Sequence, residues 1–388
     1  MKINIVMANW VSLAGGIRST AVLADHLQKR GHEVYVVCPQ KRRPTVRQQL
    51  KSLIKGKGLI ASQLKGVSHF DDFEIPCRVL DHRDPVTDAD LPDADIVMAT
   101  WWETAEWVNR LSPSKGAKVY FIRHHEVFDY FPLEMQYKAT ASYSLPLHKI
   151  TISKWLLDLM STKYGDHQVS FVPNSIELQK YYASPRGKQK QPTIGLMYRD
   201  QYWKGCDISL KAFSLAAQKI PNLRLVAFGV NPPSPKLPLP EGTEYFQQPP
   251  QDQIKDIYAR CDAWLFGSRF EGFGRPILEA MACRTPVIAT PAGAAPELLE
   301  KGGGLLVKPE DSEDMAIAIE KICNLSNSEW KQLSDQAYAN VHGYTWDDAA
   351  QLCEQAFETA IARTKRGELS SINPLELATP ARSSALSS

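Results

Sequence analysis

A glycine-rich stretch with two glutamates offers the most direct chemistry in this 388-residue chain. Its sequence over residues 268–282 is Ser-Arg-Phe-Glu-Gly-Phe-Gly-Arg-Pro-Ile-Leu-Glu-Ala-Met-Ala, with seven residues between Glu271 and Glu279. Glycines let a backbone approach a ligand closely, and Pro276 suits the first turn of a helix, whose free amides and positive dipole end attract anions. Both carboxylates could then face one ligand. The plainer interpretation is a glycine-rich turn with two solvated glutamates.

Two cations, Arg199 and Lys204, form a second candidate group in the segment 197–205. They follow an apolar run that is predicted as a strand. At such a strand end, two cations could clamp a diphosphate and stabilise the charge that develops on a leaving phosphate. The alternative is ordinary surface charge.

Short apolar runs alternate with helical patterns along the chain, and this alternation predicts the elements that position these residues. It is typical of parallel sheets covered by helices on both faces, which bind ligands at the carboxyl ends of their strands. A polar break near 174–191 separates two series, so we expect an α/β chain with two doubly wound domains. The expected strands are 3–8, 33–38, 95–100, 118–122 and 149–153, then 193–198, 224–229, 263–267, 286–290 and 305–307.

The end of the chain differs in composition from the two series. Residues 367–388 contain six serines and show no helical period. Such a composition cannot bury enough apolar surface to fold, so we expect a disordered tail.

These motifs together resemble a known family. The pattern Glu-Gly-Phe-Gly-x-Pro-x-x-Glu-Ala-Met-Ala resembles the signature of retaining glycosyltransferases of family 4, and Arg199…Lys204-Gly205 matches the spacing of its basic motif, with Tyr198 where the family has glycine. Further segments resemble the family in the same order along most of the chain: Gly15-Gly16, 93–100, 172–177, 304–307 and 344–346.

The resemblance implies the GT-B architecture, in which two Rossmann-like doubly wound domains face each other across a cleft. The first domain, 1–178, would bind the acceptor. The second, 190–343, would bind a nucleotide sugar. The helix 346–365 would pack back on the first domain.

The resemblance also implies a role for each site residue. Arg199 and Lys204 would bind the donor diphosphate, Glu279 the ribose, and Glu271 the transferred sugar near its reacting face. Gly15 and Gly16 would let the first domain approach the diphosphate and the acceptor. Backbone groups would also contribute to diphosphate binding, at Gly272, Phe273, Gly274 and Arg275.

A histidine after the fifth strand of the first domain is a further catalytic residue in this family. The chain offers His124 and His125 at this place, and we favour His125. Some family members have no histidine here, so a plain polar loop is the alternative.

The acceptor is expected near Trp101, Trp102, His124 and Glu126. The two tryptophans follow a predicted strand, and their ring faces suit stacking on sugars. Core packing against the neighbouring helix is an equal alternative.

Retaining members of this family are thought to transfer the sugar on the face from which the nucleotide leaves, and the departing phosphate oxygen takes the acceptor proton. No carboxylate pair of the glycosidase kind is evident, which agrees with such a reaction. Catalysis would then be mainly electrostatic. We expect no cofactor and no obligatory metal, because Asp88, Asp90, Asp93 and Asp95 lie at predicted element boundaries.

The charge of the chain is unevenly distributed. Lys+Arg number 45 and Asp+Glu 43, so the net charge of +2 argues against nucleic acid as a partner. Residues 40–69 nevertheless contain eight basic residues and no acidic one, beside apolar residues at helical spacing. A basic amphipathic segment fits an anionic membrane or the phosphate of a lipid-linked acceptor, so we expect a membrane contact through 41–65. A solvated helix is the alternative.

The expected compartment is the cytoplasm, with peripheral binding at the inner membrane face. No apolar run approaches the roughly 18–20 residues that cross a bilayer. The seven cysteines are widely spread and show no zinc spacing, which favours free thiols in a reducing environment.

Three other functions compete with this interpretation. A sugar-nucleotide epimerase or phosphorylase of similar shape would lack the two spaced glutamates, and a dehydrogenase would need a Gly-x-Gly-x-x-Gly turn. A catalytically silent sugar-binding module has no positive support, since both cations and both glutamates are present. We therefore expect a retaining enzyme that moves a sugar from a nucleotide-diphosphate sugar to a glycan or lipid-linked acceptor in polysaccharide or glycolipid synthesis.

Overall fold

A computed structural model describes residues 1–8, 15–40, 46–54, 58, 68–82 and 85–370 of the chain. They form two compact units. Unit 1 comprises Met1–Thr151, Leu156–Phe171 and the chain from Cys353 onward, and unit 2 comprises Ile152–Trp155 and Val172–Leu352. The main boundary between the two units therefore lies after Phe171, whereas the predicted first domain ended at residue 178.

Unit 1 is built on a parallel sheet of seven strands in the order β3-β2-β1-β4-β5-β6-β7. The central strands are buried on both faces, because helices cover both sides of a sheet of this kind. The strands are β1 (Lys2–Val6), β2 (Glu33–Cys38), β3 (Cys77–Val79), β4 (Ile96–Ala99), β5 (Ala117–Ile122), β6 (His148–Thr151) and β7 (Ser170–Phe171).

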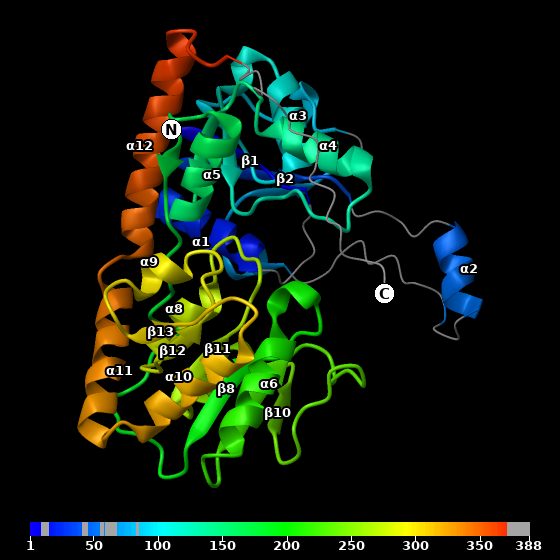
Figure 1. The fold of residues 1–388 in the computed structure, drawn as a ribbon. Coiled ribbons are helices and arrows are strands. Elements are labelled where there is room, and N and C mark those ends of the chain that lie inside the picture. Colours follow the sequence, from blue (N-terminus) through cyan, green and yellow to red (C-terminus); the bar gives the residue numbers. More distant parts are fainter. Residues whose placement is uncertain (9–14, 41–45, 55–57, 59–67, 83–84, 371–388) are drawn as a thin grey trace. The chain divides into compact units, whose positions relative to one another are not determined.

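The helices of unit 1 follow these strands in the chain (Figure 1). They are α1 (Gly15–Lys29), α2 (Val46–Ile54), α3 (Trp102–Arg110), α4 (Leu133–Ser142) and α5 (Lys154–Tyr164), of which the first two residues belong to unit 2. In α1 the apolar residues predicted at helical spacing, Ile17, Ala21, Ala24 and Leu27, are all buried.

Unit 2 contains a parallel sheet of six strands in the order β10-β9-β8-β11-β12-β13. The strands are β8 (Thr193–Met197), β9 (Arg224–Gly229), β10 (Glu244–Gln247), β11 (Ala263–Phe266), β12 (Val287–Ala289) and β13 (Gly304–Leu306). The helices are α6 (Cys206–Ala217), α7 (Ile254–Ala259), α8 (Arg275–Ala282), α9 (Ala295–Leu299), α10 (Ser312–Asn324) and α11 (Asn327–His342).

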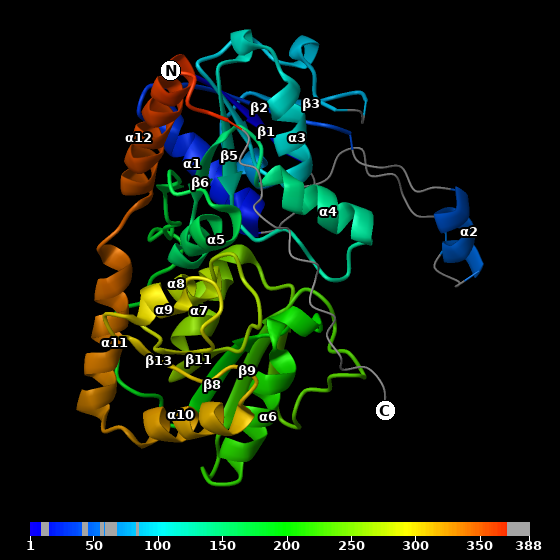
Figure 2. The same cartoon turned by 45° about the horizontal axis from the view of Figure 1, so that its top comes forward.

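Helices cover both faces of this second sheet, and Figure 2 shows them from another side. Side chains alternate between the faces of a strand. On β11, Leu265 joins the core formed with α6 and α10, whereas the ring of Trp264 packs 4.3 Å from that of Tyr258 in α7. The predicted α/β class with two doubly wound sheets is confirmed.

The long helix α12 (Trp346–Lys365) is divided between the units, and its second half belongs to unit 1. Glu354 accepts hydrogen bonds of 2.8 and 2.7 Å from the guanidinium of Arg30 and lies 2.7 Å from the ring of His32. Near its end, Arg363 lies 3.0 Å from the ring of His148. These contacts attach the C-terminal half of the helix to unit 1.

The strands that sequence reasoning missed, β3, β7 and β10, all lie at sheet edges. Edge strands are short and partly exposed, so they lack the continuous apolar runs that reveal central strands. The predicted central strands agree with the structure to within one or two residues at either end.

Two other predictions fall largely outside the described residues. Helix α2 lies within the basic segment, but 41–45, 55–57 and 59–65 are not described, and neither is the tail from residue 371. Across the described ranges, no helix combines the length and apolar character needed to cross a bilayer. All seven cysteines are free, and all except Cys77 are buried.

Candidate functional site

The sheet of unit 2 reverses its strand order between β8 and β11, which pair directly. Ligands of open α/β sheets bind at such a reversal, outside the carboxyl ends of the strands. The loop after β8 contains Arg199 and Lys204, and the loop after β11 contains Glu271. The fold therefore brings these predicted residues to one sheet edge.

Lys204 and Glu271 form an ion pair across this edge. Lys204 Nζ lies 2.7 Å from Glu271 Oε1, and the Ser268 hydroxyl donates to the same oxygen at 2.8 Å. The side chains of Lys204 and Glu271 are 25% and 14% exposed. Both charges are thus accessible to a ligand while one holds the other in place.

The close approach of the two loops requires glycine at position 205. Gly205 has a φ of 57°, and a Cβ there would overlap the carbonyl of Gly267. Any side chain would push apart the loops that hold Lys204 and Glu271.

Arg199 is half-buried beside this pair. Its backbone amide donates to Cys206 Sγ at 3.2 Å. Among the described residues its guanidinium has no hydrogen-bond or ion-pair partner. A guanidinium in that position is available to a bound anion.

Glu279 lies on α8, one helical turn beyond Arg275. Tyr258 donates its hydroxyl proton to Glu279 Oε2 at 2.8 Å, and Arg275 Nη2 lies 3.4 Å from Oε1. Burial raises the pKa of the Tyr258 hydroxyl well above its ordinary value, so it remains a donor. These contacts orient the carboxylate, and sequence reasoning did not identify Tyr258.

The glycine-rich loop ends at Gly274, which has a φ of 104° and forms the N-cap of α8. The carbonyl of Gly272 accepts hydrogen bonds from Ser153 Oγ at 2.9 Å and Trp155 Nε1 at 3.0 Å. Ser153 and Trp155 belong to the short segment of unit 2 that precedes Leu156. Local sequence patterns did not predict these two contacts, because Ser153 and Trp155 are far from the glycine-rich loop in sequence.

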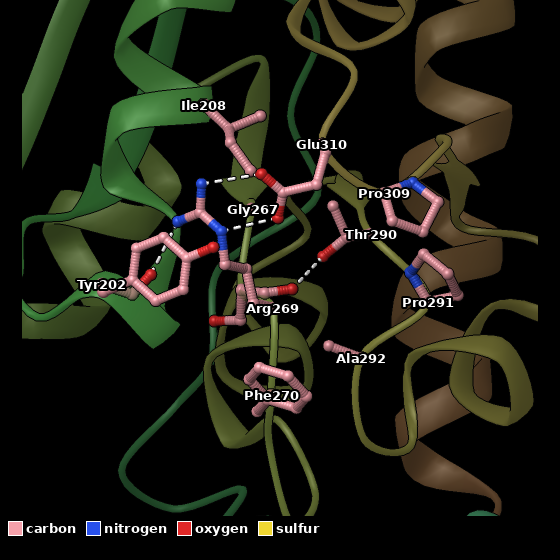
Figure 3. Close-up of a pocket in the computed structure, with 11 residues that line it drawn as sticks. Tyr202, Ile208, Gly267, Arg269, Phe270, Thr290, Pro291, Ala292, Pro309 and Glu310 are labelled. Carbon is pink, nitrogen blue, oxygen red and sulfur yellow. Dashed lines mark hydrogen bonds and ion pairs between the residues drawn. The ribbon is translucent and has the colours of Figure 1, made fainter. Parts of the chain in front are cut away.

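Two pockets open at this edge of unit 2. The smaller lies at the ends of β8 and β11 and is lined by Lys204, Ser268 and Pro276, among others. The larger, of 230 Å³, is lined by side chains that include Tyr202, Arg269 and Phe270 (Figure 3). Both pockets adjoin the loop that leads to Glu271.

The candidate residues of unit 1 lie after β1, β4 and β5, which are neighbours in its sheet. Gly15 and Gly16 form the start of α1. Arg123 donates to the carbonyl of Gly16 and, at 3.2 Å, to that of Thr100. This arginine, which sequence reasoning missed, thus joins segments that follow three strands.

Two of the candidate acceptor residues are buried, Trp102 at 3% exposed and Glu126 at 1%. The Trp102 amide and the Tyr120 hydroxyl both donate to Glu126 Oε2, at 2.7 and 2.8 Å. Within the described part of the chain Glu126 Oε1 has no hydrogen-bond partner, and burial raises the pKa of this carboxyl to about 8. In this conformation neither residue presents a surface to an acceptor, so their placement agrees with core packing.

The other two candidates, Trp101 and His124, are half-buried around Phe128. Trp101 stacks on Phe128 with ring centroids 6.3 Å apart, and His124 lies 5.1 Å from the same ring. Tyr130 extends the stack from Phe128 at 5.1 Å and is 62% exposed. The sequence-predicted residues thus form part of a larger aromatic group.

His125 contacts two tyrosines instead of lying open. Its Nε2 lies 2.8 Å from the Tyr164 hydroxyl, and its ring stacks on Tyr143 at 5.6 Å. Burial lowers the pKa of His125 to about 4, so the ring is neutral at physiological pH. It can therefore act as a hydrogen-bond partner, but it does not supply a positive charge.

The described residues contain no group of three or more histidine, cysteine, aspartate or glutamate side chains that could hold a metal ion. The absence of a metal requirement stays a prediction, as does the cleft between the domains.

Comparison with known proteins gives consistent results. Residues 179–340 match the family model of glycosyl transferases group 1. The gpi3 subunit of phosphatidylinositol N-acetylglucosaminyltransferase from Schizosaccharomyces pombe is 26% identical over 201 residues, which are 50% of this chain and 44% of that protein. O-antigen chain mannosyltransferase B from Escherichia coli is 27% identical over 115 residues, 29% of each chain. The chain thus spans less than half the length of these two relatives.

The fold is also similar to solved structures over nearly the whole chain. Anabaena Alr3699/HepE in complex with UDP has a TM-score of 0.70 and 19% identity, covering 93% of this chain and 100% of that chain. Sucrose-phosphate synthase from Thermosynechococcus elongatus has a TM-score of 0.68 and 15% identity, covering 93% and 99%. The chain has the GT-B fold of these neighbours, and its residues 179–340 are similar to the glycosyl transferases group 1 family.

Proposed function

We propose that this protein is a retaining glycosyltransferase that moves a sugar from a nucleotide-diphosphate sugar to a glycan or lipid-linked acceptor. The observation that supports this most strongly is the ion pair of Lys204 and Glu271, 2.7 Å long, at the strand-order reversal of unit 2. It lies beside the N-terminus of α8, whose dipole favours negative charge.

The proposed reaction breaks the bond between the anomeric carbon and the diphosphate oxygen. Negative charge then develops on the leaving diphosphate, and Arg199, Lys204 and the start of α8 would stabilise it. Glu271 would contact the sugar and Glu279 the ribose. The acceptor hydroxyl forms the new bond on the same face, and its proton goes to the departing phosphate oxygen. Arg199, Lys204 and the start of α8 supply positive charge without a metal, so we propose metal-independent transfer.

The acceptor class is supported by the names of relatives. One is a phosphatidylinositol N-acetylglucosaminyltransferase subunit and another an O-antigen chain mannosyltransferase. The first name indicates a lipid acceptor and the second a polysaccharide acceptor. We infer a role in the synthesis of a cell-surface polysaccharide or glycolipid, with His125 and the group around Trp101 and His124 on the acceptor side.

We also propose a peripheral membrane contact through helix α2, with the protein on the cytoplasmic side. Leu50, Leu53 and Ile54 are 58%, 49% and 78% exposed, and Lys51 lies on the same helix. Exposed apolar residues beside basic ones favour an anionic lipid surface.

The test begins with a thermal-shift screen of UDP- and GDP-linked sugars on the full chain. A donor that raises the melting temperature is then incubated with lipid and glycan acceptors, and the anomeric configuration of the product is determined by NMR. We expect retention. Inversion would contradict the mechanism, and the absence of stabilisation by every nucleotide sugar would contradict the function itself.

A further inference from the structure

Arg269 lies two residues before Glu271 and connects three segments of unit 2. Its side chain is 7% exposed, and its guanidinium makes five hydrogen bonds, which uses every N–H that an arginine offers. Two go to Asp207 at 2.8 Å each, two to Glu310 at 2.6 and 2.8 Å, and one to the Tyr202 carbonyl at 2.6 Å.

These partners come from different elements, as Figure 3 shows for Tyr202 and Glu310. Tyr202 begins the short 3-10 turn that ends at Lys204, and Asp207 lies in the first turn of α6. Glu310 lies between β13 and α10. The guanidinium also lies 4.0 Å from the Tyr202 ring, and the Arg269 amide donates to the Trp203 carbonyl at 2.9 Å. Backbone and side chain of Arg269 thus hold the same turn.

The conformation of Glu310 shows that this arrangement is tightly determined. Its φ of 59° lies in the left-handed region, which is uncommon for residues other than glycine. Such a conformation persists only where surrounding contacts enforce it. Here the contact is the bidentate ion pair between Glu310 and Arg269.

The position of this arginine relates it to the candidate donor site. Tyr202 is two residues before Lys204, and Arg269 is two residues before Glu271. The Lys204–Glu271 pair spans only 2.7 Å, so it forms only if the two loops keep a fixed distance. Displacement of a charged group by about 1 Å can cost 10²-fold in rate.

We propose that Arg269 is a positioning residue of the donor site. It fixes the turn that contains Lys204 against the loop that contains Glu271, so that cation and carboxylate are in place before the substrate binds. This inference rests on the proposed function. Arg269 itself contacts neither donor nor acceptor in this proposal; it acts through Lys204.

The test uses Arg269→Gln and Arg269→Lys in the full chain. We expect Arg269→Gln to lower kcat by at least about tenfold with little change in the donor KM, since a displaced Lys204 would fail to stabilise charge that develops mainly in the transition state. Arg269→Lys should not restore activity, because an ammonium cannot pair with two carboxylates in the fork geometry of arginine.

Arg284→Gln is the matched control. Arg284 is 11% exposed, pairs with Asp335 at 2.5 Å and lies 3.8 Å from the Tyr338 ring, but it follows the opposite end of α8. We expect this variant to keep its kcat even if its melting temperature falls. Equal loss of kcat in both variants would overturn the proposal.

A double-mutant cycle separates positioning from general stability. If Arg269 acts through Lys204, Arg269→Gln should change the residual kcat of Lys204→Ala by less than about twofold. The proposal is overturned if Arg269→Gln reduces the activity of Lys204→Ala as much as that of the wild type.

Failure of the proposed function would not prevent this test. If the wild type transferred no sugar from any donor, hydrogen exchange of residues 199–205 and 268–275 would decide. Faster exchange in Arg269→Gln than in Arg284→Gln supports the positioning role. Equal exchange in the two variants overturns it.

Discussion

Glu126 should make the stability of the protein depend on pH in an unusual direction. Burial raises the pKa of its carboxyl from 4.5 to about 8 in the folded protein. Between these values the folded state keeps a proton that the unfolded state has lost. Folding therefore becomes less favourable as pH rises from about 4.5 to about 8, and this penalty is fully present above pH 8.

The size of the effect follows from this gap of about 3.5 pH units. Each unit corresponds to about 1.4 kcal/mol, so the penalty approaches about 5 kcal/mol at pH 8. In Glu126→Gln the side chain does not titrate, so the stability of this variant lacks the pH-dependent penalty. The amide oxygen can still accept from the Trp102 amide and the Tyr120 hydroxyl.

At low pH the same substitution should change the stability little. Oε2 accepts two hydrogen bonds, so the proton of the neutral carboxyl lies on Oε1, which has no hydrogen-bond partner among the described residues. The amide nitrogen of glutamine would occupy the same place, and a buried donor without an acceptor costs about 1–3 kcal/mol in either protein. Glu126→Gln should thus be about as stable as the wild type near pH 5 and more stable near pH 8.

The assay is urea unfolding of both proteins across this pH range, followed by tryptophan fluorescence. Glu103→Gln, in the first turn of the same helix α3, is the matched control for the loss of a carboxyl group. If the difference between Glu126→Gln and the wild type were independent of pH, Glu126 would be ionised in the folded protein and the reasoning would be refuted.

Four further predictions concern the proposed activity. Lys204→Ala should lower kcat by about 10²–10³-fold, because it removes the positive charge that stabilises the leaving diphosphate. Lys211→Ala, which changes an exposed lysine on α6, should leave kcat unchanged. Similar rates for the two variants would refute the role of Lys204. Tyr258→Phe should raise the donor KM by about three- to tenfold, because Glu279 loses a hydrogen bond that orients it; an unchanged KM would show that this bond is dispensable. Transfer should continue in EDTA at the rate measured without it, and loss of turnover that Mg²⁺ restores would contradict a metal-independent reaction. In flotation, the protein should bind phosphatidylglycerol vesicles at low salt and dissociate at high salt, whereas absence from the vesicles at low salt would contradict the membrane contact.

Local patterns were sufficient for the central strands and for the main residues of unit 2. Apolar runs such as 33–38 and 224–229 coincide with β2 and β9 because burial on both faces leaves a direct trace in composition. The glycines and Pro276 marked the start of α8 because turn and cap chemistry acts between neighbours. Edge strands such as β10, half-exposed and short, leave no such trace.

The roles of Trp102 and Glu126 show the limit of that reasoning. Their residue types suit a sugar acceptor, but whether an aromatic ring or a carboxyl faces solvent depends on what packs over it. In the fold, Tyr120 and the start of α3 enclose Glu126, and the same burial that removes it from the surface raises its pKa. A pKa belongs to an environment and not to a residue type.

The sequence by itself determined which residues could act and which strand end each follows: Arg199 and Lys204 after β8, Glu271 and Glu279 after β11. Only the tertiary structure decided that Lys204 pairs with Glu271, that Arg269 binds three segments together, and that Ser153 and Trp155 hold the glycine-rich loop. The physical reason is the range of the interactions. Helix caps, turns and apolar periodicity are set within a few residues, whereas ion pairs and burial form between segments that become neighbours only when the sheet assembles.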